Sequence, residues 1–375
     1  MDTCDVLIVG GGPAGSSCAK QLVEAGLDVV VLDKSLFPRD KVCAGWITPA
    51  VVEELEIDLS DYRRSYVCQD IRAFRTGPMQ GPYVHNLYND TVSYGIRRCE
   101  FDHYLLQRSG ARLKLGEPLQ QLQRQNSYWI INNSMRASML VGAGGHFCPV
   151  ARYLGARVGK TERSVAAQEI EFKMTAEQAE ACPVKADTPE LFFYPDLSGY
   201  GWLFRKGDFL NIGVGREDTG KISQSATVFV ESLKQRGKIP HNTPEKLKGH
   251  AYLLYEHAAR KLVSDSVLLI GDAAGLAYTE SGEGIRPAVE SGLMAAEVIL
   301  HANGDYKELR LKPYLENIVT RFGERQAVSN AWLPGNIKRA LGRQVLSSRF
   351  LSRHILLDRF FLHINDQPVQ LERAS

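Results

Sequence analysis

The chain has 375 residues, of which 44% are hydrophobic, and this size predicts a large core built from two or three structural parts. Its formal net charge of +2 offers no electrostatic basis for binding nucleic acid, and its seven cysteines form no CxxC pair that would indicate a zinc site or a disulfide framework. We therefore expect no nucleic-acid partner, no metal site and a reducing, cytoplasmic location. The acidic N-terminus and the short apolar runs predict neither a signal peptide nor a membrane span.

The N-terminal segment is predicted to form a strand, a turn, a helix and a second strand. The β-branched run Val6–Val9 predicts a buried strand, and the second strand is predicted at Val29–Leu32. Between them, Ser16–Ala25 has apolar residues on one helical face and is followed by Gly26, a residue type that commonly ends helices. This order of elements is typical of a nucleotide-binding α/β unit.

The turn between these elements contains the pattern Gly-x-Gly-x-x-Gly. Gly10 permits a tight turn, Gly12 lets the backbone approach a pyrophosphate, and Gly15 lets the helix pack closely on the strand. Asp33 follows the second strand and is placed to accept hydrogen bonds from a ribose diol. A glycine-rich turn in an ordinary α/β domain is the alternative, but it leaves Asp33 unexplained, and the motif alone does not separate NAD from FAD. The candidate cofactor-binding residues of this unit are Gly10, Gly12, Pro13, Ala14, Gly15, Asp33 and Lys34.

The stretch Phe37–Trp46 (FPRDKVCAGW) places Cys43 between a lysine and a glycine. Three roles are open for this cysteine: an apolar filler, a redox thiol, or a group placed against a cofactor. No other cysteine is spaced to pair with it, which argues against a redox pair and against a metal site. The remaining alternatives are a small residue that lets the loop pass close to a cofactor, and a thiol that gives a proton there.

The segment RRCEFDHYLL predicts a helix in which Arg98 and Asp102 flank Phe101. Arg98 is a candidate for contact with a flavin. The alternative is an ordinary helix start with solvated charges, and this segment alone does not decide between the two.

The segment 191–215 predicts a β-hairpin whose turn is Gly207-Asp208. Tyr200, Trp202 and Phe204 alternate along its first strand, so we expect them to share one face of a sheet. Such an aromatic wall suits an isoprenoid chain. The alternative is a sheet face that packs into the protein's own core.

A third segment, from Val267 onward, predicts a strand, a glycine-rich turn and a long helix that begins near Gly284. Asp272 in the turn is placed to bond a ribityl or phosphate oxygen. The positive end of the helix would face the N1/C2=O edge of a flavin and favour its reduction. The candidate cofactor-binding residues here are Gly271, Asp272, Gly282, Gly284 and Ile285.

Residues 336–363 are strongly amphipathic and carry many arginines. The predicted apolar side contains Ile337, Leu341, Val345, Phe350 and Ile355. A basic amphipathic helix of this kind can lie on an anionic membrane surface. The alternative, which we favour slightly, is a terminal helix pair that packs on the cofactor-binding domain and covers its pocket.

Taken together, GxGxxG with a terminal acid, R-x-x-F-D, and G-D-A-A with G-x-G-I resemble the FAD-dependent oxidoreductases of the para-hydroxybenzoate hydroxylase fold. The resemblance implies an α/β protein in which residues 1–60, 97–155 and 260–305 form a discontinuous, Rossmann-like FAD-binding domain. Residues 61–96 and 156–259 would form an antiparallel-sheet substrate domain, and residues 306–375 a C-terminal helical region.

Within that fold, the motifs resemble those of the geranylgeranyl reductases. Gly144 stands where the hydroxylases have an aspartate, and no two tryptophans have the spacing of the halogenase Trp-x-Trp signature. The run from Tyr200 to Lys206, followed by Gly-Val-Gly, is similar to the reductases' Y-x-W-x-F-P-K…G-x-G signature, with Arg205 in place of proline. KVCAGW likewise resembles their K-x-C-G-x-G element, and GEGIRPAVESG their GGGI…A…SG element.

This resemblance implies FAD as the cofactor and hydride transfer from the reduced flavin to a carbon–carbon double bond of an isoprenoid or lipid-like substrate. It implies that Cys43, whose family position lies near the flavin ring, supplies the proton, with Tyr200, His146, Glu283 and water as the other candidates. We assign Cys43 and Tyr200 as catalytic. The substrate-binding residues are assigned as Trp46, Tyr200, Trp202 and Phe204, and the cofactor-binding set gains Lys41, Val42, Cys43, Ala44, Arg98 and Gly144.

The expected partners are an apolar small-molecule substrate, an external reductant and, peripherally, a membrane surface. The reductant is left open between NADPH and a ferredoxin-type donor, because no second nucleotide-binding fingerprint is present. Two other functions remain open at this point: a flavin monooxygenase of an aromatic or alkene substrate, and a non-catalytic flavin electron-transfer protein.

Overall fold

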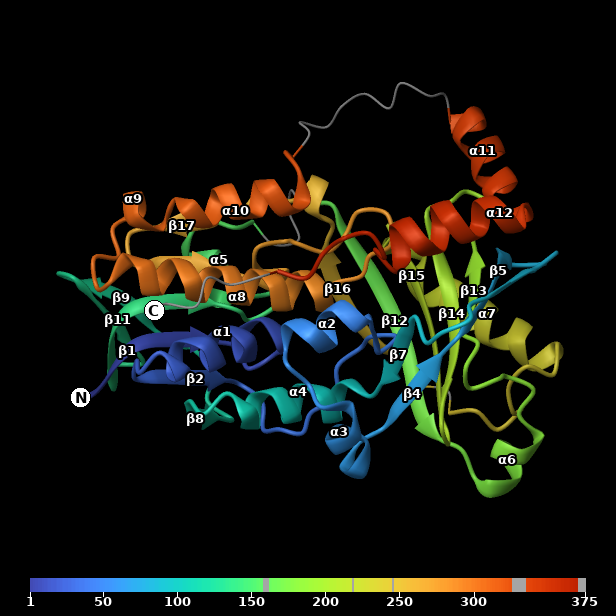
Figure 1. Ribbon diagram of the computed structural model, residues 1–375, viewed down its shortest axis with the longest axis horizontal. Helices are drawn as coiled ribbons and strands as arrows, with labels where there is room; N and C mark the ends of the chain where they lie inside the picture. The colour runs from blue at the N-terminus through green and yellow to red at the C-terminus, as the bar shows by residue number, and fades with distance from the viewer. Residues whose placement is uncertain (158–161, 218, 245, 326–334, 370–375) are drawn as a thin grey trace.

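The computed structural model describes residues 1–375 except 158–161, 218, 245, 326–334 and 370–375. It shows an elongated molecule with one sheet toward each end (Figure 1). A small third sheet lies between them, and helices cover the outer faces. Among the described residues, no helix combines the length and the hydrophobicity needed to cross a lipid bilayer.

The first sheet has the strand order β17-β18-β11-β1-β2-β8, with β18, β11, β1, β2 and β8 running parallel and β10 and β9 added antiparallel beside β11. Val6, Leu7 and Ile8 are fully buried, as expected for a central strand that is covered on both faces. The strands are β1 (Asp2–Val9), β2 (Val29–Asp33), β8 (Arg112–Leu115), β9 (Leu122–Gln125), β10 (Tyr128–Ile131), β11 (Met135–Gly142), β17 (Val263–Ser264) and β18 (Val267–Leu269).

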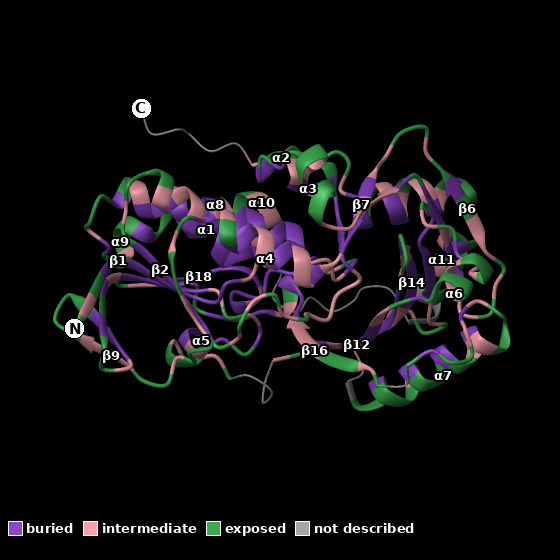
Figure 2. Ribbon diagram, turned by 90° about the horizontal axis from the view of Figure 1, so that it is seen from below, coloured by how far each residue is buried: buried purple, intermediate pink, exposed green. Residues whose placement is uncertain are grey.

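Helices α1 and α8 cross closely against this sheet. Gly292 of α8 makes the crossing possible, because a Cβ there would lie 2.4 Å from the carbonyl oxygen of Ala14 in α1. The buried colouring of the first sheet and of the inner helix faces in Figure 2 marks this core. The helices around it are α1 (Pro13–Glu24), α4 (Arg98–Arg108), α5 (Pro149–Tyr153) and α8 (Ile285–Ala302).

Two predicted boundaries in this unit were too narrow. The helix predicted at Ser16–Ala25 begins at Pro13, because proline is well suited to the first helical position, where its missing N–H costs nothing. The strand predicted at Val6–Val9 extends back to Asp2, because Asp2, Thr3 and Cys4 pair with β11. The predicted order of elements is confirmed.

The second sheet has the order β16-β12-β15-β14-β13-β5-β6 and is antiparallel except where β13 runs parallel to β5. The hairpin predicted in segment 191–215 is confirmed as β14 and β15, and Gly207 at its turn has a φ of +57°. The strands are β5 (Ala73–Pro78), β6 (Val84–Leu87), β12 (Ser164–Lys173), β13 (Glu190–Phe193), β14 (Gly199–Lys206), β15 (Phe209–Arg216) and β16 (Lys248–Leu253).

The two faces of the second sheet have different neighbours. Leu203 and Ile212 face α7 (Ile222–Gln235), where they pack around Phe229. Trp202 and Phe204 face the opposite way, toward the middle of the molecule. The short helix α6 (Ala176–Ala181) follows β12.

The small third sheet joins the two larger ones. Trp46 of its strand β3 packs with the second sheet, whereas the adjacent Ile47 packs with α4 and α8 of the first. This sheet and the helices beside it are β3 (Trp46–Ile47), β4 (Cys68–Ile71), β7 (Ser93–Ile96), α2 (Pro49–Glu54) and α3 (Leu59–Ser65).

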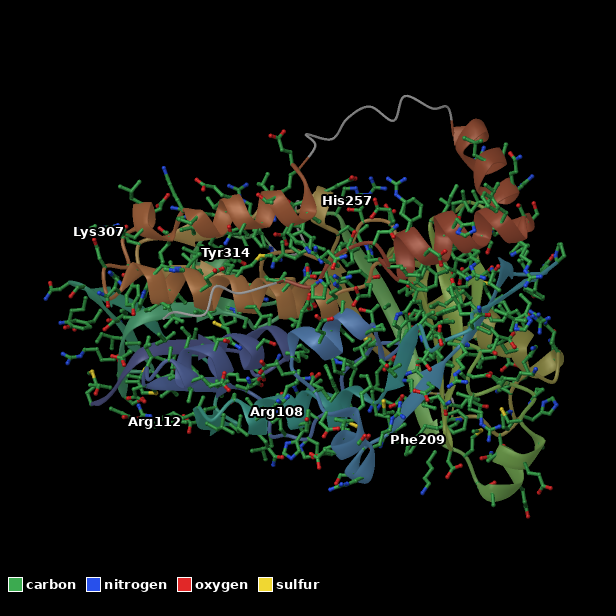
Figure 3. The ribbon with its side chains drawn as sticks, viewed as in Figure 1. Arg108, Arg112, Phe209, His257, Lys307 and Tyr314 are labelled. Atoms are coloured by element: carbon green, nitrogen blue, oxygen red, sulfur yellow. The ribbon has the colours of Figure 1, made fainter. Side chains whose placement is uncertain are left out.

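The described C-terminal helices divide between the two ends of the molecule (Figure 1). Helices α9 (Glu308–Leu311) and α10 (Pro313–Phe322) lie beside α8, and Tyr314, labelled in Figure 3, donates a hydrogen bond to the carbonyl oxygen of Leu269 (2.9 Å). By contrast, α11 (Gly335–Ser347), α12 (Arg349–Leu351) and a π-helical segment, η4 (Ser352–Phe361), lie over the second sheet.

The predicted apolar side of residues 336–363 is only partly correct. Val345 packs against the core, but Leu341 and Phe350 are 49% and 69% exposed. The buried apolar residues of this segment are Leu346, Leu356, Leu357, Phe361 and Leu362. The physical reason is a break at Ser348, whose hydroxyl caps α12, followed by π-helical turns that change the angular spacing of side chains. The expected packing on the cofactor-binding domain is also wrong, because these helices cover the second sheet. The side chain of Ile337 lies outside the described part.

Candidate active site

A cavity of about 480 Å³ lies between the two large sheets. The carboxyl ends of β1, β2 and β11 open into it, as do the N-terminal turns of α1 and α8. One face of the second sheet and the loop containing residues 39–46 complete the wall. Crevices at the carboxyl ends of parallel strands are where open α/β sheets bind ligands.

The glycine-rich turn forms one end of the cavity. Gly10 has a φ of +117°, and a Cβ there would lie 2.3 Å from the carbonyl oxygen of Ala143, so only glycine fits. Gly12 precedes α1, whose N-terminus has no side-chain cap among the described residues, and its first-turn N–H groups remain open to a ligand. Gly15 lies behind the cavity, where a Cβ would be 1.9 Å from the Gly10 oxygen, in keeping with the predicted helix–strand contact.

Asp33 holds this turn in place through two hydrogen bonds and can still accept hydrogen bonds from a ligand. Its Oδ2 accepts a hydrogen bond from the Gly11 N–H (2.8 Å), and its Oδ1 accepts one from the Ser35 N–H (2.8 Å). Each carboxylate oxygen can accept a second hydrogen bond. Asp33 and its neighbour Lys34 line the cavity, so the geometry suits a ribose diol.

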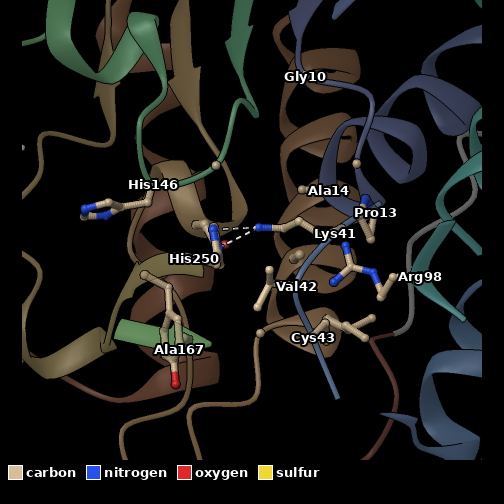
Figure 4. A pocket seen from close by; sticks show the side chains of 18 of the residues that line it. Gly10, Pro13, Ala14, Lys41, Val42, Cys43, Arg98, His146, Ala167 and His250 are labelled. Atoms are coloured by element: carbon tan, nitrogen blue, oxygen red, sulfur yellow. Dashed lines mark hydrogen bonds and ion pairs between the residues drawn. The ribbon is translucent and has the colours of Figure 1, made fainter. Parts of the chain in front are cut away.

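Three half-buried polar side chains, Lys41, His250 and Asp272, line the cavity together. Lys41 reaches His250 on β16 (Nζ–Nε2 2.5 Å), as Figure 4 shows, and His250 in turn contacts Asp272 (3.4 Å). Burial lowers the pKa of Lys41 to about 8, against the opposing charge of Asp272. Burial alone would raise the pKa of Asp272, but the hydrogen bond from His250 and the charge of Lys41 bring it to about 2.

Arg98 and Cys43 form a second contact in the cavity. The Arg98 guanidinium makes a bidentate pair with Asp102 (2.8 and 3.0 Å), which is fully buried. Burial alone would lower the pKa of Arg98, but Asp102 and a hydrogen-bonding contact with Cys43 raise it overall. The reading of Arg98 as a solvated helix-start charge is therefore wrong, because its side chain is buried and lines the cavity.

The loop that carries Cys43 is tightly constrained. Gly45 has a φ of +67°, and a Cβ there would lie 2.2 Å from the Ile96 oxygen and 2.5 Å from Lys206 Nζ. Lys206 is itself buried and donates to Ile96 O (2.9 Å) and Glu171 (2.8 Å). A glycine at position 45 is therefore required by backbone conformation and by space.

The predicted aromatic wall lines the other end of the cavity. Tyr200, Trp202 and Phe204 share one face of β14, as predicted, and Trp46 stacks on Phe204 with ring centroids 5.5 Å apart. Phe361 from η4 joins them, 5.5 Å from Trp46 and 5.3 Å from Tyr200. The same rings pack among core residues, so this face both lines the cavity and belongs to the core.

The candidate proton donors differ in their surroundings. Tyr200 already donates its hydroxyl hydrogen to the Ser281 oxygen (2.7 Å), and burial raises its pKa well above the ordinary value. Burial lowers the pKa of His146 to about 4, so this side chain is neutral near pH 7. Burial raises the pKa of Glu283 to about 7, and its Oε2 has no hydrogen-bond partner among the described residues.

The FAD dependent oxidoreductase family profile matches residues 5–80. An uncharacterised protein of Methanosarcina barkeri is 30% identical over 311 residues, covering 80% of this chain and 75% of that protein. A menaquinone reductase of Mycobacterium tuberculosis is 29% identical (88% and 83% covered), and a digeranylgeranylglycerophospholipid reductase of Methanosphaera stadtmanae is 26% identical (86% and 84%).

A solved structure of a geranylgeranyl bacteriochlorophyll reductase-like protein from Thermoplasma acidophilum superposes with a TM-score of 0.74 at 21% identity. The superposition covers 92% of this chain and 88% of the Thermoplasma acidophilum chain. A halogenase structure in complex with FAD gives a TM-score of 0.70 at 14% identity, covering 93% and 78%. This chain belongs to the FAD-dependent oxidoreductases, and its relatives include proteins named as digeranylgeranylglycerophospholipid reductases.

The residues present fit the family's FAD. The turn at Gly10 has room only for backbone, the open N-terminus of α1 after Gly12 suits a pyrophosphate, and Asp33 can still accept hydrogen bonds from a ribose. Gly284 caps α8 without a side chain, so the positive end of that helix also faces the cavity, as predicted. We propose that these residues hold the dinucleotide, with the flavin end toward Cys43.

Most predicted site residues meet at this cavity. The exceptions are Gly15 and Gly271, which lie behind its wall, where they allow close packing against Gly10 and Ala14. Predicted residues that line it are Gly10, Gly12, Pro13, Ala14, Asp33, Lys34, Lys41, Val42, Cys43, Ala44, Trp46, Arg98, Gly144, Tyr200, Trp202, Phe204, Asp272, Gly282, Gly284 and Ile285.

Sequence reasoning missed several lining residues. Arg39 lies within the FPRDKVCAGW stretch and pairs with Asp102 (3.3 Å), and its place two residues before Lys41 was the available signal. His250 and Phe361 carry no motif, because the fold alone brings β16 and η4 to the cavity.

Proposed function

We propose that this chain is an FAD-dependent reductase that saturates carbon–carbon double bonds of an isoprenoid or other lipid-like substrate. One observation carries this proposal: a single cavity joins a dinucleotide cradle to an aromatic wall, with the Cys43 loop between them. Aromatic and aliphatic side chains bind apolar chains by removing their surface from water. Membership of a family whose relatives include reductases of isoprenoid lipids supports the same substrate class.

When bound, FAD supplies the hydride that adds to one carbon of the double bond. The other carbon needs a proton, which we assign to the Cys43 thiol. The thiolate left behind would be stabilised by the Arg98 guanidinium, which Asp102 holds in place. The wall of Trp46, Trp202 and Phe204 excludes water and orients the chain. Tyr200, whose hydroxyl is already bonded, is proposed to act as part of this wall.

The test is anaerobic turnover. Purified holoenzyme reduced by dithionite is mixed with a prenyl diphosphate, a prenylated glycerophospholipid or a menaquinone, and products are analysed by mass spectrometry. We expect a mass gain of two hydrogens for each double bond saturated, without oxygen. Product that forms only in air and contains one oxygen atom would establish a monooxygenase, and reoxidation by none of these compounds would contradict the proposal. Replacing dithionite by NADPH or by reduced ferredoxin identifies the physiological donor.

We further propose that the exposed face of α11 and α12 contacts an anionic membrane. Arg343 of α11 and Arg349 of α12 are exposed there, and Phe350 presents a ring that is 69% exposed. Basic residues flanking an exposed aromatic ring suit an anionic lipid surface. Truncation would remove the buried Phe361, so point variants are the proper test.

Flotation with vesicles of phosphatidylglycerol and phosphatidylcholine measures this contact. We expect Arg343→Glu with Arg349→Glu to abolish flotation, and Phe350→Ser to weaken it. Vesicles of phosphatidylcholine alone serve as the control. Equal flotation of wild type and the double variant on the anionic vesicles would rule this face out.

A further inference from the structure

Both polar groups of the Cys43 backbone are held by side chains of the second sheet. The Cys43 N–H donates to Oε2 of Glu169 on β12 (2.8 Å). The Cys43 carbonyl oxygen accepts from Nδ2 of Asn211 on β15 (3.1 Å). Neither hydrogen bond is part of a strand pairing. Both are made by side chains that reach out of the second sheet to the backbone of the Cys43 loop. Both side chains belong to buried residues, which makes each hydrogen bond costly to lose.

Asn211 also connects Cys43 to the aromatic wall. The indole N–H of Trp202 donates to Asn211 Oδ1 (2.7 Å), and Trp202 lines the cavity. An indole nitrogen is a donor only, so it must face the amide oxygen, and this leaves the amide nitrogen directed at the Cys43 carbonyl. The orientation of the Asn211 amide is therefore set by Trp202.

Surrounding groups keep this arrangement rigid. Asn211 Nδ2 lies 3.3 Å from both Glu169 and Glu171, and Lys206 donates to Glu171 (2.8 Å). Burial raises the pKa of Glu169 to about 7, although Lys206 and the Cys43 N–H oppose the rise. A carboxyl group accepts the Cys43 N–H in either protonation state, so the contact persists across neutral pH.

We propose that Asn211 and Glu169 are positioning residues that hold the Cys43 thiol in the cavity, and that Asn211 makes the placement of that thiol depend on Trp202. The proposal rests on the function proposed above only for its effect on the reaction. The other part of the proposal is that Asn211, Glu169 and Trp202 set the reactivity of Cys43. This part does not depend on which substrate the protein uses.

Four variants isolate the individual contacts. Asn211→Asp keeps the acceptor for Trp202 and loses the donor to Cys43, and Trp202→Phe keeps an aromatic ring and loses the N–H. Glu169→Gln keeps an acceptor for Cys43, whereas Glu169→Ala removes it. Gln168→Ala is the matched control, because Gln168 neighbours Glu169 on β12 but bonds Ser223 on the other side of the strand.

The first readout is the rate at which Cys43 is alkylated by iodoacetamide in oxidised holoenzyme, measured by peptide mass spectrometry. Cys182 packs in a different core cluster and provides the internal reference in each sample. We expect the Cys43/Cys182 rate ratio to change by about fivefold or more in Asn211→Asp and Glu169→Ala, and by about twofold in Trp202→Phe. Glu169→Gln and Gln168→Ala should stay close to wild type.

The second readout is single-turnover kinetics. Asn211→Asp should slow alkene saturation by about tenfold, with little change in KM or in flavin reduction, because a misplaced donor affects only protonation. In the alkylation readout, combining Trp202→Phe with Asn211→Asp should change the Cys43/Cys182 ratio no further than Asn211→Asp alone, since the two residues act on Cys43 as one unit.

Three outcomes decide the matter. An unchanged alkylation ratio in Asn211→Asp and Glu169→Ala overturns the proposal, whatever the kinetics. Additive effects of Trp202→Phe and Asn211→Asp overturn the link to Trp202. If wild type saturates no isoprenoid while the ratio shifts as expected, the proposed function falls and the positioning roles stand. If Asn211→Asp does not fold, the alkylation ratio of Trp202→Phe still tests the link between Trp202 and Cys43.

Discussion

The Cys43 side chain contacts the Arg98 guanidinium inside the cavity. A buried arginine needs an anion, and Asp102 already supplies one through a bidentate pair. That pair holds the guanidinium beside Cys43. In the proposed reaction, a fixed cation therefore lies next to the thiol that we assign as the proton donor.

Replacing Cys43 by alanine tests that role. We expect the rate of alkene saturation to fall by about a hundredfold while the rate of flavin reduction stays close to wild type, because only the first step needs the proton. Stopped-flow absorbance separates the two half-reactions. Cys43→Ser, with similar size and a much weaker acid, should be impaired nearly as strongly. If both half-reactions keep their wild-type rates in both variants, Cys43 only packs.

The crowded position of Gly45 predicts that a larger residue there lowers the stability of the protein. Gly45→Ala should lower the free energy of unfolding by about 3 kcal/mol, because the methyl group meets the Ile96 oxygen and the φ of +67° is strained for alanine. Gly207→Ala is the control: its φ is +57°, but nothing lies within 4 Å of the added Cβ, so we expect a loss of about 1 kcal/mol. Urea unfolding of both variants measures the difference, and equal losses would contradict the crowding argument.

At the scale of elements, the segment after η4 is tied back to the first sheet's helices. The buried guanidinium of Arg286 in α8 donates to the backbone oxygens of His363 (3.3 Å), Asp366 (2.8 Å) and Gln367 (3.3 Å). Glu290 pairs with the same arginine (2.7 Å). These contacts hold the end of η4 in place, and with it Phe361 at the cavity wall.

Phe361→Ala should therefore act on both stability and substrate choice. We expect a loss of about 3 kcal/mol, because the ring is 2% exposed and leaves a cavity behind. The space gained should shift kcat/KM toward bulkier or longer isoprenoid chains. Phe350→Ala, in the same helical region but exposed, should change stability by less than about 0.5 kcal/mol and leave the chain-length profile unchanged. A profile that is the same in both variants would show that Phe361 does not limit the chain.

For the whole molecule, buried carboxyl groups predict how stability depends on pH. Burial raises the pKa of Glu283 to about 7, of Glu169 to about 7 and of Glu54 to about 8, from the ordinary glutamate value of 4.5. Between the two values, the folded state binds more protons than the unfolded state, so its stability falls as pH rises. Asp272 acts in the opposite sense, because its pKa is lowered to about 2 and its contribution is lost in acid.

Glu283→Gln isolates one of these groups. At about pH 8 the wild type holds a buried charge that the variant lacks, so the variant should be more stable, by at most about 3 kcal/mol. Near pH 4 both side chains are neutral and the difference should vanish. Chemical denaturation at the two pH values measures the change. A variant that gains no stability at the higher pH would show that Glu283 is ionised without penalty.

The dinucleotide unit followed from the sequence because its signals are local. A glycine pattern, a short β-branched run and a helical period near 3.6 residues each involve only a few neighbouring residues, so the elements within residues 6–33 could be predicted without knowledge of the rest of the chain. The aromatic wall followed for the same reason, since alternation along β14 requires no knowledge of its partners. Most motif residues on the separate segments line the cavity, with Gly15 and Gly271 behind its wall, but at the sequence level only the resemblance related these segments to one another.

Features that depend on contacts between distant segments of the chain could be seen only in the tertiary structure. The buried side of the C-terminal helices could not be predicted fully from a regular helical period, because the cap at Ser348 and the π-helical turns of η4 interrupt that period. His250, Asn211 and Glu169 lie on strands whose pairing brings them to Lys41 and Cys43 from more than a hundred residues away in the chain. Sequence by itself determined the cofactor class and the groups available for chemistry; the fold decided which groups meet, because burial and pairing are properties of the packed chain.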